Sequence, residues 1–120
     1  MGKLKSILMS GFTAEKNSLY KNITPQQAKE MMDETSDYIL LDVRTPEEFL
    51  AGHIPNAVLL PDYEIIRKAE NIIDDKNKKI LVYCQSGGRS LGAAKALTKM
   101  GYTNVFNFGG IMRWPYSITK

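Results

Sequence analysis

Cys84 is the only cysteine among the 120 residues, and it stands between two segments of different periodicity. The apolar run 80–83 before it contains β-branched and aromatic residues, which is typical of a strand buried on both faces. The Gly87–Gly88 pair after it allows a tight loop, and a helical pattern begins within two residues of that pair. The sequence therefore places Cys84 between the end of a strand and the start of a helix.

A thiol in this position is suited to nucleophilic chemistry. Backbone N–H groups of the loop can converge on one point, where the helix dipole also favours negative charge. Both effects lower the pKa of a thiol and make the thiolate available near neutral pH. The alternative is a buried packing residue, but packing does not require two glycines, a hydroxyl and an arginine in the next five positions. We therefore expect Cys84 to be a nucleophile. The residues expected to form an anion-binding loop around it are Gln85, Ser86, Gly87, Gly88 and Arg89.

Asp42 and Arg44 are further candidates for the site. They stand at the carboxyl end of the predicted strand 38–43, and pockets form at that edge of an open parallel sheet. They could therefore border the pocket of the nucleophile. The structural alternative, which we favour, is that Asp42 ties down a loop while Arg44 pairs with Glu47 or Glu48.

Strands and helices alternate along the chain. Apolar or β-branched runs predict strands over 19–23, 38–43, 57–60, 80–83 and 103–108. Helical patterns extend from 25 to 32 or 34, from 46 to 51, over 63–73, and from 89 or 90 to 100. Thr24 and Thr45 are each expected to cap a helix, because each is followed directly by a proline. Gln27 and Glu48, three residues further on, can complete a capping box. The alternation predicts an α/β fold, with a mostly parallel sheet and helices on both faces. The helix over 63–73 is expected to bury an apolar side formed by Ile65, Ile66, Ala69, Ile72 and Ile73.

Composition excludes several classes of function. The net charge of +3 is too small to favour nucleic acid, and no apolar run approaches the length of a membrane span. One cysteine excludes an intrachain disulfide and fits a reducing compartment, so we expect a cytoplasmic protein. One histidine, His53, leaves no cluster for a zinc site. We expect a monomer with no membrane or nucleic-acid partner.

Three linked stretches resemble the rhodanese domain family. The segment 84–89 has the C-x-x-G-x-R form of its active-site loop, while 40–57 and 108–114 resemble its N-terminal and C-terminal signatures. Their order and spacing fit from about Ile23 to Tyr116. The resemblance implies the rhodanese fold with about five strands. Residues 19–120 are expected to form this domain, and residues 1–18 an N-terminal extension.

The resemblance implies a sulfurtransferase without a metal or organic cofactor. The Cys84 thiolate would attack a small anionic donor such as thiosulfate and become a persulfide, and a thiol or cyanide would then accept the sulfur. The physiological partner could also be a sulfur-relay protein. The side chain of Arg89 could turn inward to assist the thiolate or outward to a carboxylate.

Two other functions are considered. A phosphatase or arsenate reductase also uses a cysteine and an arginine around an oxyanion, but the loop here has four residues between Cys84 and Arg89. That loop is one residue shorter than in cysteine-based phosphatases, which predicts a ring too narrow for a phosphoryl group. A non-catalytic binding module of a sulfur pathway is the third possibility. The presence of Cys84 and both loop glycines counts against it.

Overall fold

A computed structural model describes residues 20–120 of the protein. The predicted N-terminal extension lies outside the described residues. Five strands form one sheet, in the order β1-β5-β4-β2-β3, and every pairing is parallel. The strands are β1 (Tyr20–Asn22), β2 (Ile39–Asp42), β3 (Val58–Leu59), β4 (Ile80–Cys84) and β5 (Val105–Gly110). The predicted α/β fold with a parallel sheet is confirmed.

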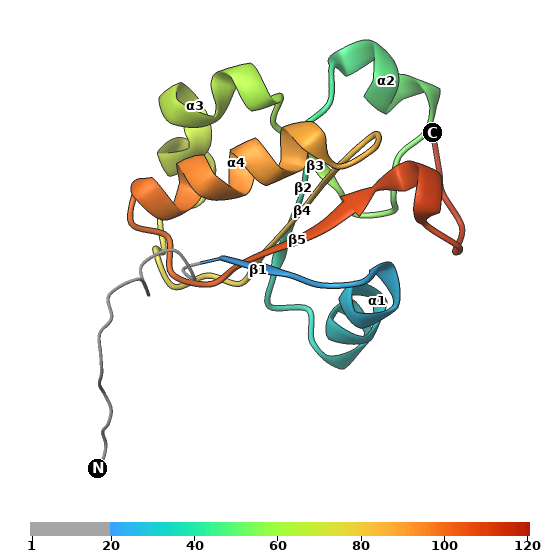
Figure 1. Cartoon of the computed structure of the whole chain (residues 1–120), viewed down its shortest axis with the longest axis horizontal. Helices are drawn as coiled ribbons and strands as arrows, with labels where there is room; N and C mark the ends of the chain where they lie inside the picture. Colours follow the sequence, from blue (N-terminus) through green and yellow to red (C-terminus); the bar gives the residue numbers. More distant parts are fainter. Residues whose placement is uncertain (1–19) are drawn as a thin grey trace.

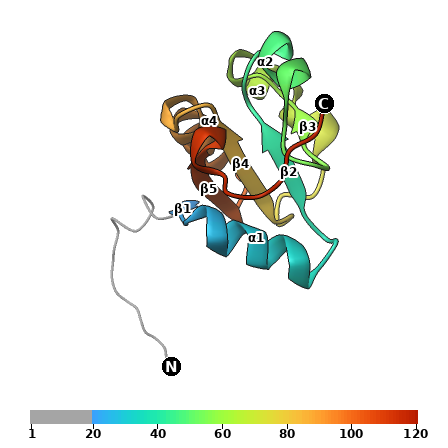
Figure 2. The same cartoon turned by 90° about the vertical axis from the view of Figure 1, so that its right-hand side faces the viewer.

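Helices cover both faces of the sheet, as predicted. Figures 1 and 2 show α3 and α4 on one face and α1 on the other, with α2 beyond one end of the sheet. The α-helices are α1 (Pro25–Glu34), α2 (Pro46–Ala51), α3 (Ile65–Ile72) and α4 (Gly88–Lys99). Two short 3-10 helices, η2 (Asp62–Glu64) and η3 (Ile111–Arg113), precede α3 and follow β5.

The central strand β4 separates two hydrophobic clusters. All five of its residues are buried, because it has a neighbouring strand on each side and helices above and below. Ile80 and Val82 belong to the cluster under α3 and α4, whereas Leu81 and Tyr83 belong to the cluster that contains α1. This alternation places Cys84, two residues after Val82, at the end of the α4 side.

Both predicted capping boxes are present. The Thr24 hydroxyl accepts from the backbone N–H of Gln27 at 3.0 Å, and Gln27 accepts from the backbone N–H of Thr24 at 2.9 Å. Thr45 and Glu48 form the same pair of hydrogen bonds at the start of α2. Each box satisfies N–H groups that the first turn of a helix leaves without a partner.

The buried side of α3 differs from the prediction. Ile65, Ala69 and Ile73 are buried, but Ile66 is 76% exposed and Ile72 is 39% exposed. The α-helix begins only at Ile65, because a 3-10 turn precedes it. Successive residues of an α-helix lie about 100° apart, so Ile66 turns away from the stripe that Ile65 and Ala69 form against α4.

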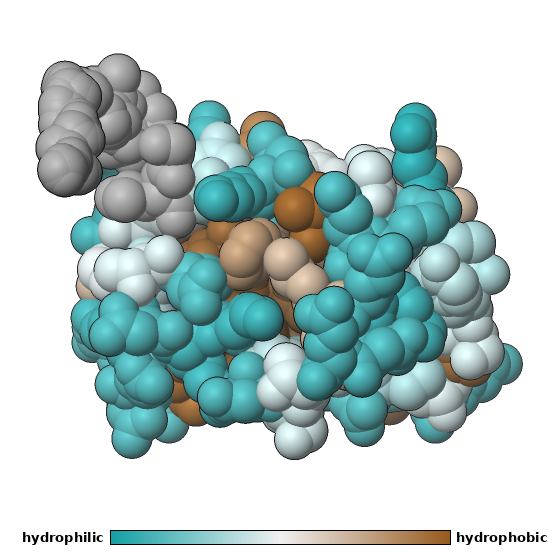
Figure 3. Space-filling model, turned by 90° about the horizontal axis from the view of Figure 1, so that it is seen from below, coloured by the Kyte–Doolittle hydropathy of each residue, from teal (hydrophilic) through white to brown (hydrophobic). Residues whose placement is uncertain are grey.

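The outer face on the α1 side of the sheet is mostly hydrophilic. Figure 3 shows only a small group of hydrophobic residues near the centre of this view. Among residues 20–120 no helix has the length and apolar character needed to cross a lipid bilayer.

Replacing Ile65 and Ile66 separately with alanine tests the orientation of α3. We expect Ile65→Ala to lower the free energy of unfolding by about 2–5 kcal/mol, because the deleted atoms leave a cavity under α4. Ile66→Ala should change it by less than about 0.5 kcal/mol, since the side chain is mostly in solvent. Urea denaturation of both variants measures the difference. Equal losses would contradict the described packing of α3.

Candidate active site

The predicted strand, loop and helix around Cys84 are present. Cys84 is the last residue of β4, and α4 begins four residues later at Gly88. Gly87, which precedes α4, has a φ of 116° in the left-handed region that side chains rarely adopt. This residue lets the chain reverse from the strand into the helix, so that backbone N–H groups of Ser86, Gly87 and Ser90 are directed at the sulfur.

The Cys84 sulfur lies buried at the base of this loop. The residue is 1% exposed, and the backbone N–H of Gly87 donates to Sγ at 3.0 Å. Burial raises the pKa of the thiol, but hydrogen bonds from the Ser90 side chain and from the backbone of Ser90, Gly87 and Ser86 lower it. The net effect is a pKa below the ordinary value of a thiol. The thiolate is therefore stabilised by the hydroxyl of Ser90 and by backbone N–H groups of the loop and the first turn of α4.

Ser90 is a part of the site that the sequence analysis did not single out. Its Oγ lies 3.6 Å from Sγ of Cys84 and donates to the carbonyl oxygen of Gly87 at 3.1 Å. A hydroxyl has one proton to donate. In the thiol form the S–H donates to Ser90, whereas in the thiolate form the hydroxyl can turn and donate to the sulfur. A hydroxyl residue on the buried side of the first helical turn is the signal that could have identified it.

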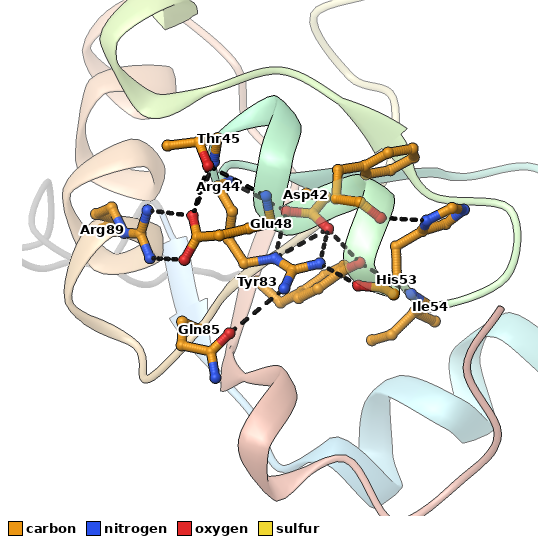
Figure 4. A network of polar contacts seen from close by, with 11 residues as sticks. Asp42, Arg44, Thr45, Glu48, His53, Ile54, Tyr83, Gln85 and Arg89 are labelled. Atoms are coloured by element: carbon orange, nitrogen blue, oxygen red, sulfur yellow. Dashed lines mark hydrogen bonds and ion pairs between the residues drawn. The ribbon is translucent and has the colours of Figure 1, made fainter. Parts of the chain in front are cut away.

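The side chain of Arg89 turns outward to a carboxylate. Its Nη1 and Nη2 donate to the two carboxylate oxygens of Glu48 on α2, at 2.8 and 3.0 Å (Figure 4). This pair lowers the pKa of Glu48 to about 2 and raises the pKa of Arg89. Because Glu48 also closes the capping box with Thr45, the start of α2 is tied to the start of α4. Arg89 therefore has its guanidinium occupied on the outside of the loop.

Asp42 and Arg44 form a buried ion pair beside the loop. Asp42 is fully buried and accepts from Nε and Nη2 of Arg44, the latter at 2.7 Å, and from the hydroxyl of Tyr83 at 2.6 Å. The predicted pairing of Arg44 with Glu47 or Glu48 is wrong, because Arg44 pairs instead with the carboxylate of Asp42, two residues before it. The favoured structural role agrees with these contacts.

Arg44 also extends from this pair to the loop. Its Nη1 donates to Oε1 of Gln85 at 3.4 Å, and its Nη2 donates to the carbonyl oxygen of Gly52 at 2.7 Å (Figure 4). The buried pair thus connects the end of β2, the end of α2 and the first residue of the loop. It holds the wall of the site in place and has little charge left to offer an anion.

The end of β5 supports the loop from the opposite side. Gly110 is the sheet partner of Cys84, and the pairing shifts register just before it. A Cβ atom on Gly110 would lie 2.6 Å from Cα of Ser86 and closer still to the carbonyl oxygen of Gln85. The loop rests directly on the glycine backbone, and β5 continues to Gly110, two residues beyond the predicted end of the strand at residue 108.

Two hollows flank the loop. One, of about 300 Å³, lies between η2, α3 and α4 and includes Gly88 and Arg89 in its lining. The other, of about 340 Å³, lies beside Ser86 and the Gly109–Gly110 end of β5. A small molecule can therefore reach the loop from the side of α4 or from the side of β5.

Comparisons with known proteins agree with this geometry. A family model for the rhodanese-like domain matches residues 24–115. A sulfurtransferase of Allochromatium vinosum is 35% identical over 97 residues, which cover 80% of this chain and 89% of that protein. The thiosulfate sulfurtransferase PspE of Escherichia coli is 38% identical over 71 residues, which cover 59% and 68%. A solved structure of a rhodanese with anions from Escherichia coli superposes with a TM-score of 0.66 at 34% identity, covering 69% of this chain and 98% of that one.

The pH dependence of Cys84 alkylation tests the stabilisation of the thiolate. Because the pKa is lowered, the rate of reaction with iodoacetamide should rise with pH around a midpoint below about 8.5, the value of a free cysteine. Ser90→Ala should move that midpoint upward by about one pH unit, since a hydrogen bond to the charged sulfur is lost. Ser86→Ala is the matched control, because it removes a hydroxyl but keeps the backbone N–H. A Ser90→Ala midpoint equal to that of the wild type would contradict the described role.

A methyl group at Gly110 should displace the loop. We expect Gly110→Ala to slow alkylation of Cys84 at least about tenfold, because the new Cβ cannot coexist with the backbone of Gln85 and Ser86. Gly92→Ala on α4 is the control, since nothing lies within 4 Å of its Cβ position and alanine favours the helix. Alkylation followed by intact mass spectrometry compares the two variants. Full reactivity in Gly110→Ala would show that the loop does not depend on this contact.

Proposed function

The chain belongs to the rhodanese-like family, and on that premise we propose that it is a sulfurtransferase in which Cys84 carries the sulfur as a persulfide. The observation that carries the proposal is the polar surroundings of Sγ of Cys84: the backbone N–H of Gly87 donates to it at 3.0 Å, and the hydroxyl of Ser90 lies 3.6 Å from it. They favour a thiolate at the base of the loop. The names of the relatives support the same chemistry.

In the first half-reaction, the Cys84 thiolate attacks the outer sulfur of a donor such as thiosulfate. The sulfur–sulfur bond of the donor breaks, and its electron pair leaves with sulfite. The outer sulfur remains on Cys84 as a persulfide with one negative charge. Backbone N–H groups from Gln85 to Arg89 surround this atom, as oxyanion-type donors do, and they need no rearrangement during the reaction.

In the second half-reaction, a nucleophilic acceptor takes the outer sulfur. Cyanide or a thiolate attacks that atom, the bond to Sγ breaks, and the electron pair returns to Cys84. The enzyme alternates between two covalent states, so the kinetics should be of the ping-pong type. No step needs a metal or an organic cofactor. A small thiol or a sulfur-relay protein could serve as the physiological acceptor.

The phosphatase alternative is less well supported than sulfur transfer. The loop is short, and both terminal nitrogens of Arg89 are occupied by Glu48. Stabilising a phosphoryl group requires donors for three equatorial oxygens, to which a free guanidinium would contribute two. A persulfide needs donors around one sulfur atom only.

Mass spectrometry of the intact protein tests the proposal. Incubation with thiosulfate should add one sulfur atom to the wild-type protein, and cyanide should remove it. Cys84→Ser should fold normally, because serine is nearly the same size, and should take up no sulfur. If Cys84→Ser still transfers sulfur to cyanide, Cys84 is not the carrier.

The same preparations of wild type and Cys84→Ser also test the phosphatase alternative. A generic aryl phosphate should not be hydrolysed at a rate above that of Cys84→Ser. Hydrolysis that depends on Cys84, in a protein that takes up no sulfur, would overturn the sulfurtransferase proposal.

A further inference from the structure

Arg113 differs from the other arginines of the chain in its charge environment. The sequence contains four arginines. Three of them pair with carboxylates: Arg44 with Asp42 at 2.7 Å, Arg67 with Glu64 at 3.6 Å and Arg89 with Glu48 at 2.8 Å. Within the described residues 20–120, no carboxylate lies within 4.0 Å of the guanidinium of Arg113. The charges of Arg44 and Arg89 are thus balanced by carboxylates, whereas the charge of Arg113 is not balanced by a neighbouring carboxylate of the described residues.

The position of Arg113 links it to the catalytic loop. It ends η3, the short helix that follows directly on the Gly110 contact with Gln85 and Ser86. The backbone N–H of Met112 donates to the carbonyl oxygen of Gln85 at 3.3 Å, which fixes η3 against the loop. Arg113 is therefore held close to the loop by the same contacts that support Cys84.

Arg113 and Ser86 line the same pocket, the hollow of about 340 Å³ on the β5 side. That volume lies at the lower end of the range for small-molecule sites, about 300–1,000 Å³. The lining contains polar side chains and no carboxylate: besides Arg113 and Ser86, its polar members are Asn22, Thr24 and Asn107. The hollow on the α4 side differs, because its lining includes Asp62 and an arginine already paired with Glu48.

We propose that the pocket on the β5 side is an anion subsite, in which Arg113 binds the carboxylate of a small organic thiol that accepts sulfur from Cys84. This inference rests on the proposed function. A carboxylate matches the planar fork of a guanidinium, and the hydroxyl and amide groups of the lining can donate further hydrogen bonds. Ser86, a residue of the loop around Cys84, forms part of the lining of this subsite.

The geometry favours an acceptor with its charge some distance from its sulfur. In thiosulfate the charged oxygens are attached to the sulfur that leaves, so they stay at the reacting end. Arg113 shares a pocket lining with Ser86, whereas the hydrogen bonds to Sγ of Cys84 involve Ser86, Gly87 and Ser90 and not Arg113. A molecule with a thiol at one end and a carboxylate at the other can occupy both places at once.

The transfer step is balanced without any oxidant. The thiol of the acceptor loses its proton to solvent, and the resulting thiolate attacks the outer sulfur of the Cys84 persulfide. The bond between that sulfur and Sγ breaks, and its electron pair returns to Sγ as the thiolate. The product is the persulfide of the acceptor, and the outer sulfur keeps its oxidation state. The carboxylate takes no part in bond making and only positions the thiol, so Arg113 is a positioning residue.

Single-turnover discharge of the persulfide tests this subsite. The protein is loaded with thiosulfate, freed of excess donor, and mixed with thiols of matched length that differ only in charge. The probes are mercaptopropionate with mercaptopropanol, and mercaptohexanoate with mercaptohexanol. The wild type is compared with Arg113→Gln, with Arg113→Lys, and with Arg67→Gln, which removes the same charge from an exposed arginine on α3.

Arg113→Gln should slow discharge to at least one of the two carboxylate thiols about fivefold, which is the size expected for a partly exposed ion pair. Discharge to the matching alcohol should stay unchanged. Arg113→Lys should retain most of the wild-type rate, and raised salt should shrink the difference between wild type and Arg113→Gln. Because each thiol is compared with itself across variants, its intrinsic reactivity cancels.

The outcomes separate this inference from the proposed function. If the wild-type protein does not acquire sulfur from thiosulfate, the proposed function fails. If it loads normally but Arg113→Gln slows alcohols and carboxylates equally, or slows neither, the anion subsite is wrong. An equal loss in Arg67→Gln would also overturn it, because the effect would then come from net charge rather than from Arg113.

Discussion

Hydrogen bonds from the backbone of the β4–α4 loop to a buried sulfur are the interaction on which the site depends. Cys84 ends a strand that is buried along its whole length, so its thiolate is removed from water, which by itself raises the pKa. The N–H groups of Ser86, Gly87 and Ser90 and the hydroxyl of Ser90 reverse that effect. A thiolate in this environment has little solvent to shed before it reacts, and its stabilising dipoles are already oriented.

The surrounding structure keeps these dipoles in place from three directions. Gly110 of β5 allows the loop to rest on strand backbone, Glu48 anchors the outside of the loop through Arg89, and Arg44 reaches Gln85. Together these contacts reach three residues of the loop, Gln85, Ser86 and Arg89. The buried Asp42 then has a clear role, since it neutralises Arg44 and holds it where it can contact the loop. The charged residues around Cys84 thus hold the loop in position, while uncharged backbone and hydroxyl groups contact the sulfur.

Local sequence patterns predicted much of this arrangement, and contacts between distant segments account for the rest. The capping boxes at Thr24 and Thr45, the buried strand before Cys84 and the turn at Gly87 follow from residues within a few positions of one another. The pairing of Arg89 with Glu48 joins residues 41 positions apart. From the sequence alone, several other carboxylates are equally plausible partners for Arg89. The exposure of Ile66 follows from the side of α3 that packs against α4, and the spacing of the isoleucines alone does not specify that side. Gly110 lies beyond the predicted strand 103–108, and its tight contact with Gln85 and Ser86 joins segments far apart in the chain.

Arg44 and Arg89 are both paired with carboxylates, so neither adds an unpaired positive charge that would attract anions to the site. Dipoles of N–H groups act over a few ångströms, whereas an unpaired charge acts over about a Debye length, about 8 Å at physiological ionic strength. With Arg44 and Arg89 both neutralised, the loop itself can hold an anion but cannot select among those that approach. Selection must then come from groups at the rim of the site, where a side chain can change without disturbing the backbone that stabilises the sulfur. This division explains how one rigid loop could serve different acceptors in related chains: the chemistry resides in the backbone of the loop, and the preference in the few residues beside it.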